Sequence, residues 1–440
     1  MGLVSLSSPS PKKSARSGFF SALAFPDYRQ LWFATATAQS AAWSLIVLRG
    51  ALVYRLTDSN AWVGFVTMAA LLPGLVVTPM AGFLADRFDR RRVLAATYGL
   101  NLANNLALAF LTISDNITPG LILILAIMNG CIRATEMPTN QALLPNLVPK
   151  DRLLNAVALN QLMQQGSRMI GPLITLPIIS FMGPEPAFAV PVILYGLGWT
   201  QILSIRTSSR GVVEANRGMF SNLSAGIRYI YAHPIVLSII AVTVLHCALT
   251  MAFESVFPYF SRAQLGMTTE KDLFQGPTYL MIGVGMGAIL GNLSLARIED
   301  RKFRGRLFLI LGILSGLSPI GLALAGSIEQ AMLAAAGIGA STAAFMTLSH
   351  GMVQAMVPDG IRGRIMSANT WHVQGAMGGF NAVNGLLMDV SWMTAPRLLI
   401  GTGLIFIAIV LVSLAAGPLR SIYSRGTGAA QPAPEAAPAS

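Results

Sequence analysis

Charged and amide side chains recur at helical spacing inside one apolar stretch, residues 117–147. Asn129, Arg133, Glu136 and Asn140 follow the pattern i, i+4, i+7, i+11. At about 100° per residue, all four fall within about 60° of one another on a helix. A carboxyl group beside a guanidinium at low dielectric can take up and release a proton, because burial and the cation act on it in opposite directions. We therefore treat Arg133 and Glu136 as candidates for proton transfer, and an inert ion pair at i, i+3 is the alternative.

A second polar face lies in the stretch 154–182 and is followed by Gly171-Pro172. Its members fall within about 140° of arc on a helix, and they are Asn160, Gln161, Gln164, Gln165 and Arg168. Such a face can line a wet cavity. It can also join neighbouring helices through amide hydrogen bonds, which contribute only about 0.6 kcal/mol each.

Four further ionisable residues are isolated within apolar sequence: Arg49, His246, Glu254 and His372. Intramembrane charges are functional candidates by default. Arg49 has the alternative of extending to lipid headgroups, and Glu254 is a conceivable partner for it. His246 could titrate near neutral pH, with hydrogen-bonded packing as its alternative. His372 is a candidate for cavity lining, together with several asparagines.

Enzymatic chemistry is not indicated. The four histidines and two cysteines show no metal-ligand spacing, and no phosphate-binding Gly-x4-Gly-Lys-Ser/Thr loop occurs. We expect no metal, no cofactor and no use of ATP.

The composition identifies the elements that must position these residues. Of 440 residues, 54% are hydrophobic and 11% charged, and the mean hydropathy is +0.62. A water-facing surface cannot be built from this composition. A span needs about 20 apolar residues, so the length accommodates about twelve. The net charge of +12 comes from scattered basic clusters, which disfavours nucleic-acid binding. The fold class predicted is all-α integral membrane.

Intervals without Asp, Glu, Lys or Arg locate most of the spans, because a central charge costs about 2.5 to 3.5 kcal/mol. Eight intervals are free of charge: 59–85, 93–114, 186–205, 273–296, 307–328, 330–358, 365–388 and 398–419. Four more contain the isolated charges described above: 31–54, 117–147, 154–182 and 235–259. The sequence therefore predicts twelve transmembrane helices.

The connections between spans predict the orientation. Of the 30 Lys and Arg, only Arg55, Arg262, Lys271 and Arg397 fall in connections on the outer side. Both termini are then cytoplasmic. The domains expected are a tail at 1–27, a six-helix half at 28–206, a linker at 207–234, a second half at 235–419 and a disordered tail at 420–440. Within the linker, Phe220, Leu223, Ile227 and Ile230 keep the spacing of an interfacial amphipathic helix.

An internal repeat divides the chain. Gly82 and Gly291 each precede a basic turn and are 209 residues apart. The same offset relates Val148-Pro149 to Val357-Pro358 and Asn160 to Asn369. Two parallel six-helix repeats are predicted, an arrangement in which transporters bind substrate near the membrane midplane between the halves.

The run Gly82-Phe-Leu-Ala-Asp86-Arg87-Phe-Asp-Arg90-Arg91 resembles the signature loop of the major facilitator superfamily. It departs at Asp89, where glycine is usual. By this resemblance, Asp86 and Arg90 hold the cytoplasmic side closed in the outward-facing state, and the second half, with Leu295, lacks the aspartate. The alternative is a solvated basic turn that serves topology alone.

Further segments point to one branch of this superfamily. Residues 141–145, 170–172 and 362–367 resemble the enterobactin-exporter-like branch. Arg133 also resembles the buried fourth-helix arginine of the superfamily's proton-coupled exporters. The resemblance implies the major facilitator fold and alternating access.

The function expected is export of small amphipathic compounds, driven by protons. The alternatives are an importer or facilitator of a polar metabolite, a lipid translocase, and a membrane sensor that does not transport. The partners expected are a small-molecule substrate, protons and membrane lipids. The location expected is the inner membrane of a prokaryote, with the protein a monomer.

Overall fold

The structure is a computed structural model that describes residues 20–209, 219–295, 301–415 and 417–425. Within these ranges, the side chains of a few residues, including 81–86, are not described. Most of the predicted N-terminal tail and part of the basic turn near residue 300 therefore lie outside the described residues.

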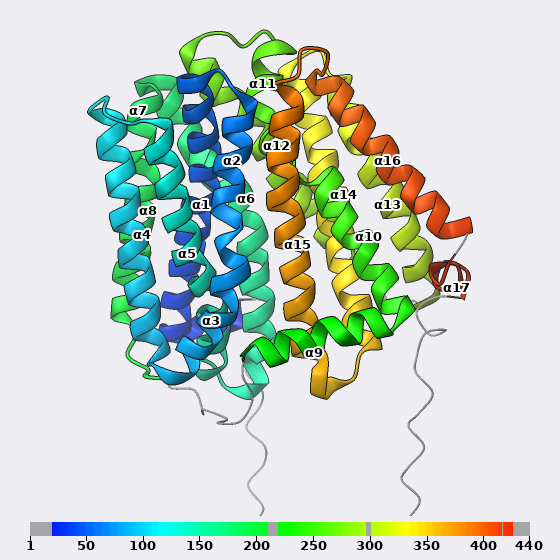
Figure 1. Cartoon of the computed structure of the whole chain (residues 1–440). Helices are drawn as coiled ribbons and strands as arrows, with labels where there is room; N and C mark the ends of the chain where they lie inside the picture. Colours follow the sequence, from blue (N-terminus) through cyan, green and yellow to red (C-terminus); the bar gives the residue numbers. More distant parts are fainter. Residues whose placement is uncertain (1–19, 210–218, 296–300, 416, 426–440) are drawn as a thin grey trace, which may run out of the picture.

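Within the described residues, the N-terminal half consists of eight α-helices, whose arrangement is drawn in Figure 1. They are α1 (Pro26–Thr57), α2 (Asn60–Leu71), α3 (Pro73–Arg87), α4 (Arg90–Ile113), α5 (Pro119–Leu143), α6 (Leu153–Met182), α7 (Pro184–Ala187) and α8 (Ala189–Ser204). The predicted span 59–85 is broken between α2 and α3 at Pro73. Proline has no backbone N–H and clashes with the preceding turn, so the second helix starts at this residue.

The C-terminal half follows the linker helix α9 (Met219–Ala232). Its helices are α10 (Pro234–Thr250), α11 (Phe257–Ala263), α12 (Glu270–Leu295), α13 (Arg301–Ala323), α14 (Ile328–Met356), α15 (Asp359–Met388), α16 (Ala395–Ala415) and α17 (Leu419–Arg425). The predicted span 235–259 is interrupted, because residues 251–256 between α10 and α11 are not helical. This non-helical segment carries Glu254.

Each predicted span coincides with one helix or one broken pair. Within the described residues, nine helices are long and apolar enough to cross a membrane. They become ten if the pair Leu223–Ala232 and Pro234–Thr250, bent by 108°, is one span. The predicted spans in α10 and α6 are among those missing from these nine helices. The helix α10 alone is short, with 17 residues, and the amide-rich face makes α6 less apolar. The chain is therefore a multi-pass helical membrane protein, and the count of twelve spans stays a prediction.

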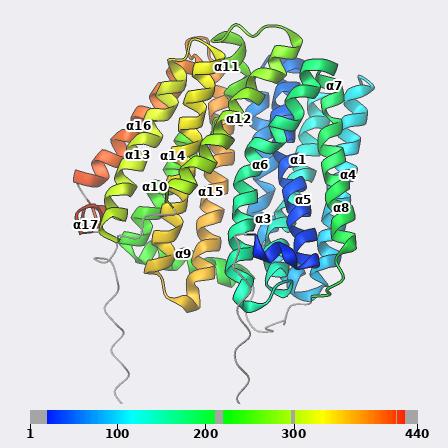
Figure 2. The same cartoon turned by 180° about the vertical axis from the view of Figure 1, so that it is seen from behind.

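The two halves meet along a seam formed by α2 against α15 and by α6 against α12 (Figures 1 and 2). Glycines permit the close approach. A Cβ atom on Gly64 of α2 would lie 2.4 Å from the carbonyl oxygen of Asn381 in α15, and one on Gly285 of α12 would lie 2.4 Å from the backbone nitrogen of Met169 in α6. Any side chain at these two positions would push the halves apart.

The helix α9 lies across one end of the molecule, which we name the linker end (Figure 1). Leu223, Ile227 and Ile230 pack on the C-terminal half, with Ile230 only 1% exposed. The predicted amphipathic helix is therefore present, but its described apolar face covers protein. The expectation of disorder from residue 420 is wrong for residues 420–425, because α17 buries Ile422 and Tyr423 against the same core.

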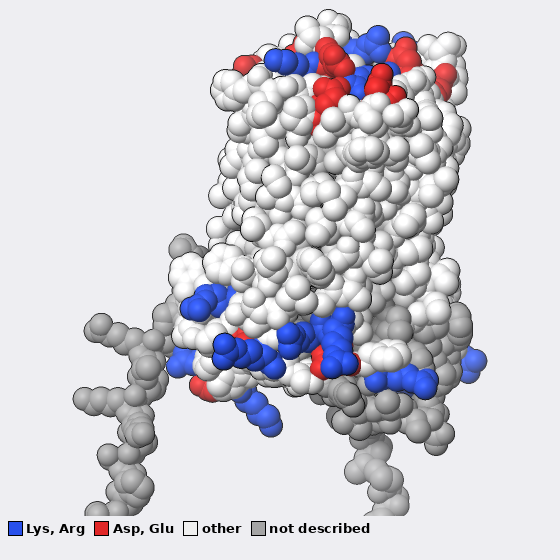
Figure 3. All heavy atoms as spheres, turned by 90° about the vertical axis from the view of Figure 1, so that its left-hand side faces the viewer, with Lys and Arg blue, Asp and Glu red and all other residues white. Residues whose placement is uncertain are grey.

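On the face drawn in Figure 3, surface charge is confined to the two ends. The side of the N-terminal half shows a wide band without charge. Lys and Arg dominate at the linker end, whereas both signs are mixed at the opposite end, which we name the latch end. An uncharged band between charged ends is the surface that a bilayer requires.

Candidate functional site

The polar stripe of α5 faces the interior of the N-terminal half. Asn129 Nδ2 donates to Asn101 Oδ1 at 2.9 Å, and Asn101 Nδ2 donates to Glu136 Oε2 at 3.5 Å. Asn140 Nδ2 donates to Thr35 Oγ1 at 2.6 Å. These partners belong to α4 and α1, so the predicted stripe packs within one half. Glu136 is 4% exposed.

Arg133 points to a different neighbour. Its Nη2 donates to Gln39 Oε1 of α1 at 3.2 Å. Among the described residues, no nitrogen–oxygen distance within 4 Å joins it to Glu136, although the two charges act on each other. The inert ion pair is therefore not formed in this conformation.

Arg49 is a buried cation, only 4% exposed. This burial does not fit a side chain that reaches lipid headgroups. In the described part of the chain it makes no hydrogen bond or ion pair, and the groups that act on it electrostatically are Arg133 and Tyr195. Glu254 is not its partner. A buried charge without a partner is costly, so this arginine should lower the stability of the fold.

We predict that Arg49→Leu raises the melting temperature of the purified protein. Removing a buried, uncompensated charge should gain about 1 kcal/mol or more. The control is Arg168→Leu, which removes a partly buried arginine that has an aromatic partner. Thermal unfolding followed by tryptophan fluorescence measures both variants. A lower melting temperature for Arg49→Leu would mean that its charge is compensated.

Near the seam, an arginine of one half and a glutamate of the other half act on each other electrostatically. The Arg168 guanidinium of α6 lies 4.6 Å from the centre of the Trp43 ring of α1. Asn381 Nδ2 of α15 donates to Glu254 Oε2 at 3.1 Å. Arg168 and Glu254 act on each other electrostatically, without an ion pair within 4 Å in the described structure.

The amide face of α6 lies toward the linker end. Gln161 is exposed, and Gln164 and Gln165 are partly buried. Gly171, by contrast, serves packing, because a Cβ atom there would lie 2.1 Å from the carbonyl oxygen of Ser40 in α1. The glutamines thus remain candidates for cavity lining, and Gly171 holds two helices of one half together.

The two histidine candidates lie in the C-terminal half. His246 is fully buried, with Nδ1 at 2.8 Å from Thr250 Oγ1 and at 3.2 Å from Ser315 Oγ. The Phe345 ring packs on its imidazole. These contacts are those expected if His246 serves hydrogen-bonded packing, the alternative to titration near neutral pH. His372 Nδ1 lies 2.7 Å from the carbonyl oxygen of Ala368, one turn earlier in α15.

The signature loop connects α3 to α4 at the linker end. Gly82 and Asp86 lie in α3, and their side chains are outside the described part. Arg90 Nη1 donates to the Ala142 carbonyl oxygen at 2.9 Å, and its backbone N–H donates to Ser209 O at 2.9 Å. Arg91 Nη2 donates to Leu203 O at 2.6 Å. Arg87 is exposed.

Asp89, the departure from the signature pattern, caps α4. Its Oδ1 accepts from the backbone N–H of Arg91 at 2.9 Å and of Arg92 at 3.4 Å. It also accepts from the Ser208 hydroxyl of the linker. Burial raises the pKa of Asp89, but the hydrogen bonds outweigh this and leave the pKa lowered.

Sequence reasoning missed the contacts that close the latch end. Asp389, after α15, caps the first turn of α2 in the other half: its carboxylate accepts from Ser59 Oγ at 2.6 Å, from Asn60 N at 2.8 Å and from Ala61 N at 3.1 Å. Nothing in the sequence pairs residues 330 positions apart. Burial raises the pKa of Asp389, but these hydrogen bonds outweigh it, so the pKa is lowered.

Two arginines add ion pairs at the latch end. Arg262 of α11 pairs with Asp58, which follows α1. Arg55 pairs with Glu185 of its own half at 2.6 Å and also with Glu270 of the other half. We name Asp389, Arg262–Asp58 and Arg55–Glu270 the latch. A surface hollow of about 540 Å³ lies between the halves beside these residues.

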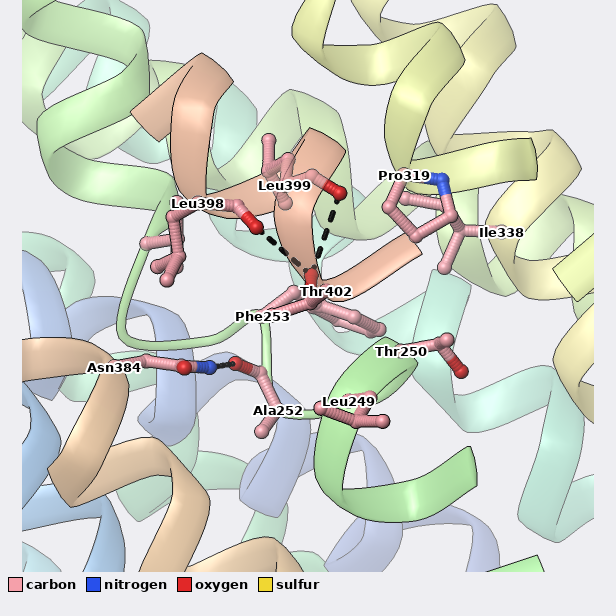
Figure 4. Close-up of a pocket in the computed structure, with 11 residues that line it drawn as sticks. Leu249, Thr250, Ala252, Phe253, Pro319, Ile338, Asn384, Leu398, Leu399 and Thr402 are labelled. Atoms are coloured by element: carbon pink, nitrogen blue, oxygen red, sulfur yellow. Dashed lines mark hydrogen bonds between the residues drawn. The ribbon is translucent and has the colours of Figure 1, made fainter. Parts of the chain in front are cut away.

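A small cavity of about 10 Å³ lies behind the non-helical segment 251–256, within the C-terminal half (Figure 4). It is about large enough for one water molecule. Asn384 Nδ2 donates to the Ala252 carbonyl oxygen at 2.7 Å beside it. This cavity is too small for a substrate, but it leaves space next to the segment that carries Glu254.

Comparison with known proteins identifies the family. A family model described as transmembrane secretion effector matches residues 17–436. The chain belongs to the transmembrane secretion effector family of the major facilitator superfamily. It is therefore a membrane transporter and not an enzyme.

Relatives and solved structures agree with this membership. This secretion effector is 32% identical over 141 residues to the staphyloferrin A transporter of Staphylococcus aureus, a match that spans 32% of this chain and 36% of that one. It is 21% identical over 378 residues to macrolide efflux protein A of Streptococcus pyogenes, spanning 83% and 90%. A nucleoside transporter shares its fold with a TM-score of 0.68 at 14% identity, covering 88% of this chain and 97% of that one.

Proposed function

We propose that this secretion effector exports small amphipathic compounds by alternating access, using the proton gradient. The observation that carries the proposal is the match to a secretion family over almost the whole chain. Relatives named as a siderophore transporter and as macrolide efflux proteins support small organic compounds as the substrate class. Because both halves of the path belong to one chain, a monomer is sufficient.

The geometry supports alternating access. The latch joins the two halves at one end, whereas the amide face of α6 lies toward the other. A polar path closed at one end by residues from both halves is what a rocking mechanism requires. Proton coupling needs a group that takes up and releases a proton, and Glu136 and Glu254 are the two carboxyl candidates.

Accumulation in cells tests the export proposal. Cells with and without the protein are given ethidium, erythromycin and a ferric siderophore, and the retained amount of each is measured. We expect lower retention of at least one compound in cells with the protein, and loss of the difference when a protonophore collapses the gradient. Equal retention of every compound would contradict export of this substrate class.

The direction of transport also depends on orientation, which we propose to place the linker end in the cytoplasm. Thr269 at the latch end and Tyr231 in α9 are both exposed. In a protein with Cys131 and Cys247 replaced by serine, Thr269→Cys should react with a membrane-impermeant thiol reagent in intact cells. Tyr231→Cys should react only after the cells are opened. The reverse pattern would invert the topology.

A further inference from the structure

Rocking of two rigid halves changes the protein neighbours of a residue only if that residue contacts both halves. Rocking shifts the proton affinity of a group directly when the protein neighbours of that group differ between the two states, because a group with the same affinity in both does not couple protonation to rocking. The positions of Glu136 and Glu254 relative to the seam therefore distinguish between them.

Glu136 has all its described neighbours in one half. Asn101 of α4 donates to it, Arg133 is on its own helix, and Tyr98 and Tyr195 come from α4 and α8. With 4% exposure, it is enclosed by helices that move together. Rocking of the two halves therefore leaves the protein neighbours of Glu136 unchanged.

Glu254 lies where the halves meet. Its hydrogen-bond donor, Asn381, belongs to α15 of the same half, and the backbone of Asn381 lies against Gly64 of α2. The cation that acts on its carboxylate, Arg168, belongs to α6 of the other half. Movement of one half past the other must change the distance between this carboxylate and this guanidinium.

The backbone around Glu254 is also suited to movement. Residues 251–256 are not helical, and they are held by Asn381, which accepts from Ser255 N at 3.2 Å, and by Asn384. Non-helical backbone at membrane depth occurs only where it is buried in protein or lines a cavity, and in transporters it marks ion and substrate sites.

We infer that Glu254, held by Asn381 in the non-helical segment at the seam, takes up and releases the coupling proton, and that Glu136 does not. This inference rests on the proposed function. The carboxylate gains one proton from one side of the membrane and gives it up on the other. Arg168, moving with the other half, favours the ionised form when it is near. Trp43, under the guanidinium, reports where Arg168 lies.

The groups around this carboxylate limit other sources of pH dependence. Arg168 of α6 is the charged group that acts on it, and Cys247 of α10 acts on Arg168 in turn. The other elements at the seam present Trp43 from α1, Gly64 from α2, Gly285 from α12 and Asn381 from α15, none of which titrates.

A fluorescence titration of the purified full chain tests the inference without any substrate. Tryptophan emission is recorded from pH 5 to 9 for the unaltered protein, Glu254→Gln, Glu136→Gln and Trp43→Phe. We expect a sigmoidal change in the unaltered protein and in Glu136→Gln, and loss of that change in Glu254→Gln and Trp43→Phe. Melting temperatures confirm that each variant is folded, and Cys247→Ser, expected to titrate normally, excludes the thiol.

Three results would overturn the inference: no pH-dependent change in the unaltered protein, its retention in Glu254→Gln, or its loss in Glu136→Gln. If Glu254→Gln does not fold, Arg168→Gln replaces it, and a titration identical to that of the unaltered protein would count against the inference. Failure of export is detected separately, by the accumulation assay, because the titration requires no cargo.

Discussion

Replacing Asp389 with alanine is expected to open the latch end and to abolish most transport. The carboxylate accepts hydrogen bonds from the side chain of Ser59 and from the first turn of α2, across the seam. Loss of hydrogen bonds to a charged group should disfavour the closed state by about 1 to 3 kcal/mol, or roughly 5- to 150-fold in the conformational equilibrium. A transporter held mainly in one state cannot complete its cycle.

Thiol labelling measures the shift. Val47 of α1 is buried against Phe253 and Val256 of the other half. In a protein with Cys131 and Cys247 replaced by serine, Val47→Cys should react slowly with a bulky impermeant reagent. Adding Asp389→Ala should accelerate that reaction about tenfold or more.

The matched control is Glu329→Gln. This exposed carboxylate is hydrogen-bonded to Ser327 beside its own helix, α14, so its neutralisation should leave both labelling and transport unchanged. If Asp389→Ala labels at the same rate as the parent, the contacts to α2 do not hold the latch end closed.

The same contacts give a pH dependence with a definite sign. Because the pKa of Asp389 is lowered in the closed state, its stabilisation of that state is fully present above the ordinary carboxyl pKa. It is lost as the pH at the latch end falls through the lowered pKa. Labelling of Val47→Cys should therefore accelerate in strongly acidic medium, and this acceleration should be absent from Asp389→Ala.

Asp86→Asn is expected to reduce transport about tenfold or more while leaving the amount of protein in the membrane unchanged. In the structure the latch end is closed, and Arg90 at the linker end donates to Ala142 O and to Ser209. By the resemblance of the loop, Asp86 contributes to closing the linker end in the opposite state. Asparagine keeps the side-chain volume but removes the charge that a guanidinium or a helix N-terminus would bind.

The control for this variant is Asp89→Asn in the same loop. Asparagine is as good an N-cap as aspartate, so α4 should keep its cap and transport should remain near normal. Uptake into inverted membrane vesicles, with protein amount measured by immunoblot, compares the two. Normal transport by Asp86→Asn would leave the loop as a topology signal alone.

Local properties of the sequence were enough to predict the helices and the polar stripe. Hydropathy and charge-free length depend on neighbouring residues, so each predicted span coincides with a helix or a broken pair. The inward position of Asn129, Glu136 and Asn140 followed from spacing, because 3.6 residues per turn fixes the face on which a side chain lies. The family signature, also a local run of residues, indicated the superfamily to which the chain belongs.

Only the tertiary structure decided which polar residues meet. The sequence offered Arg49 as a partner for Glu254, but in the fold the cation that acts on this carboxylate is Arg168. It gave no indication that Asp389 caps α2 of the other half. The spacing of residues in a helix specifies the direction of each side chain around the helix axis. A contact across the seam also depends on the tilt, depth and register of two helices. Those are fixed by close packing at residues such as Gly64 and Gly285.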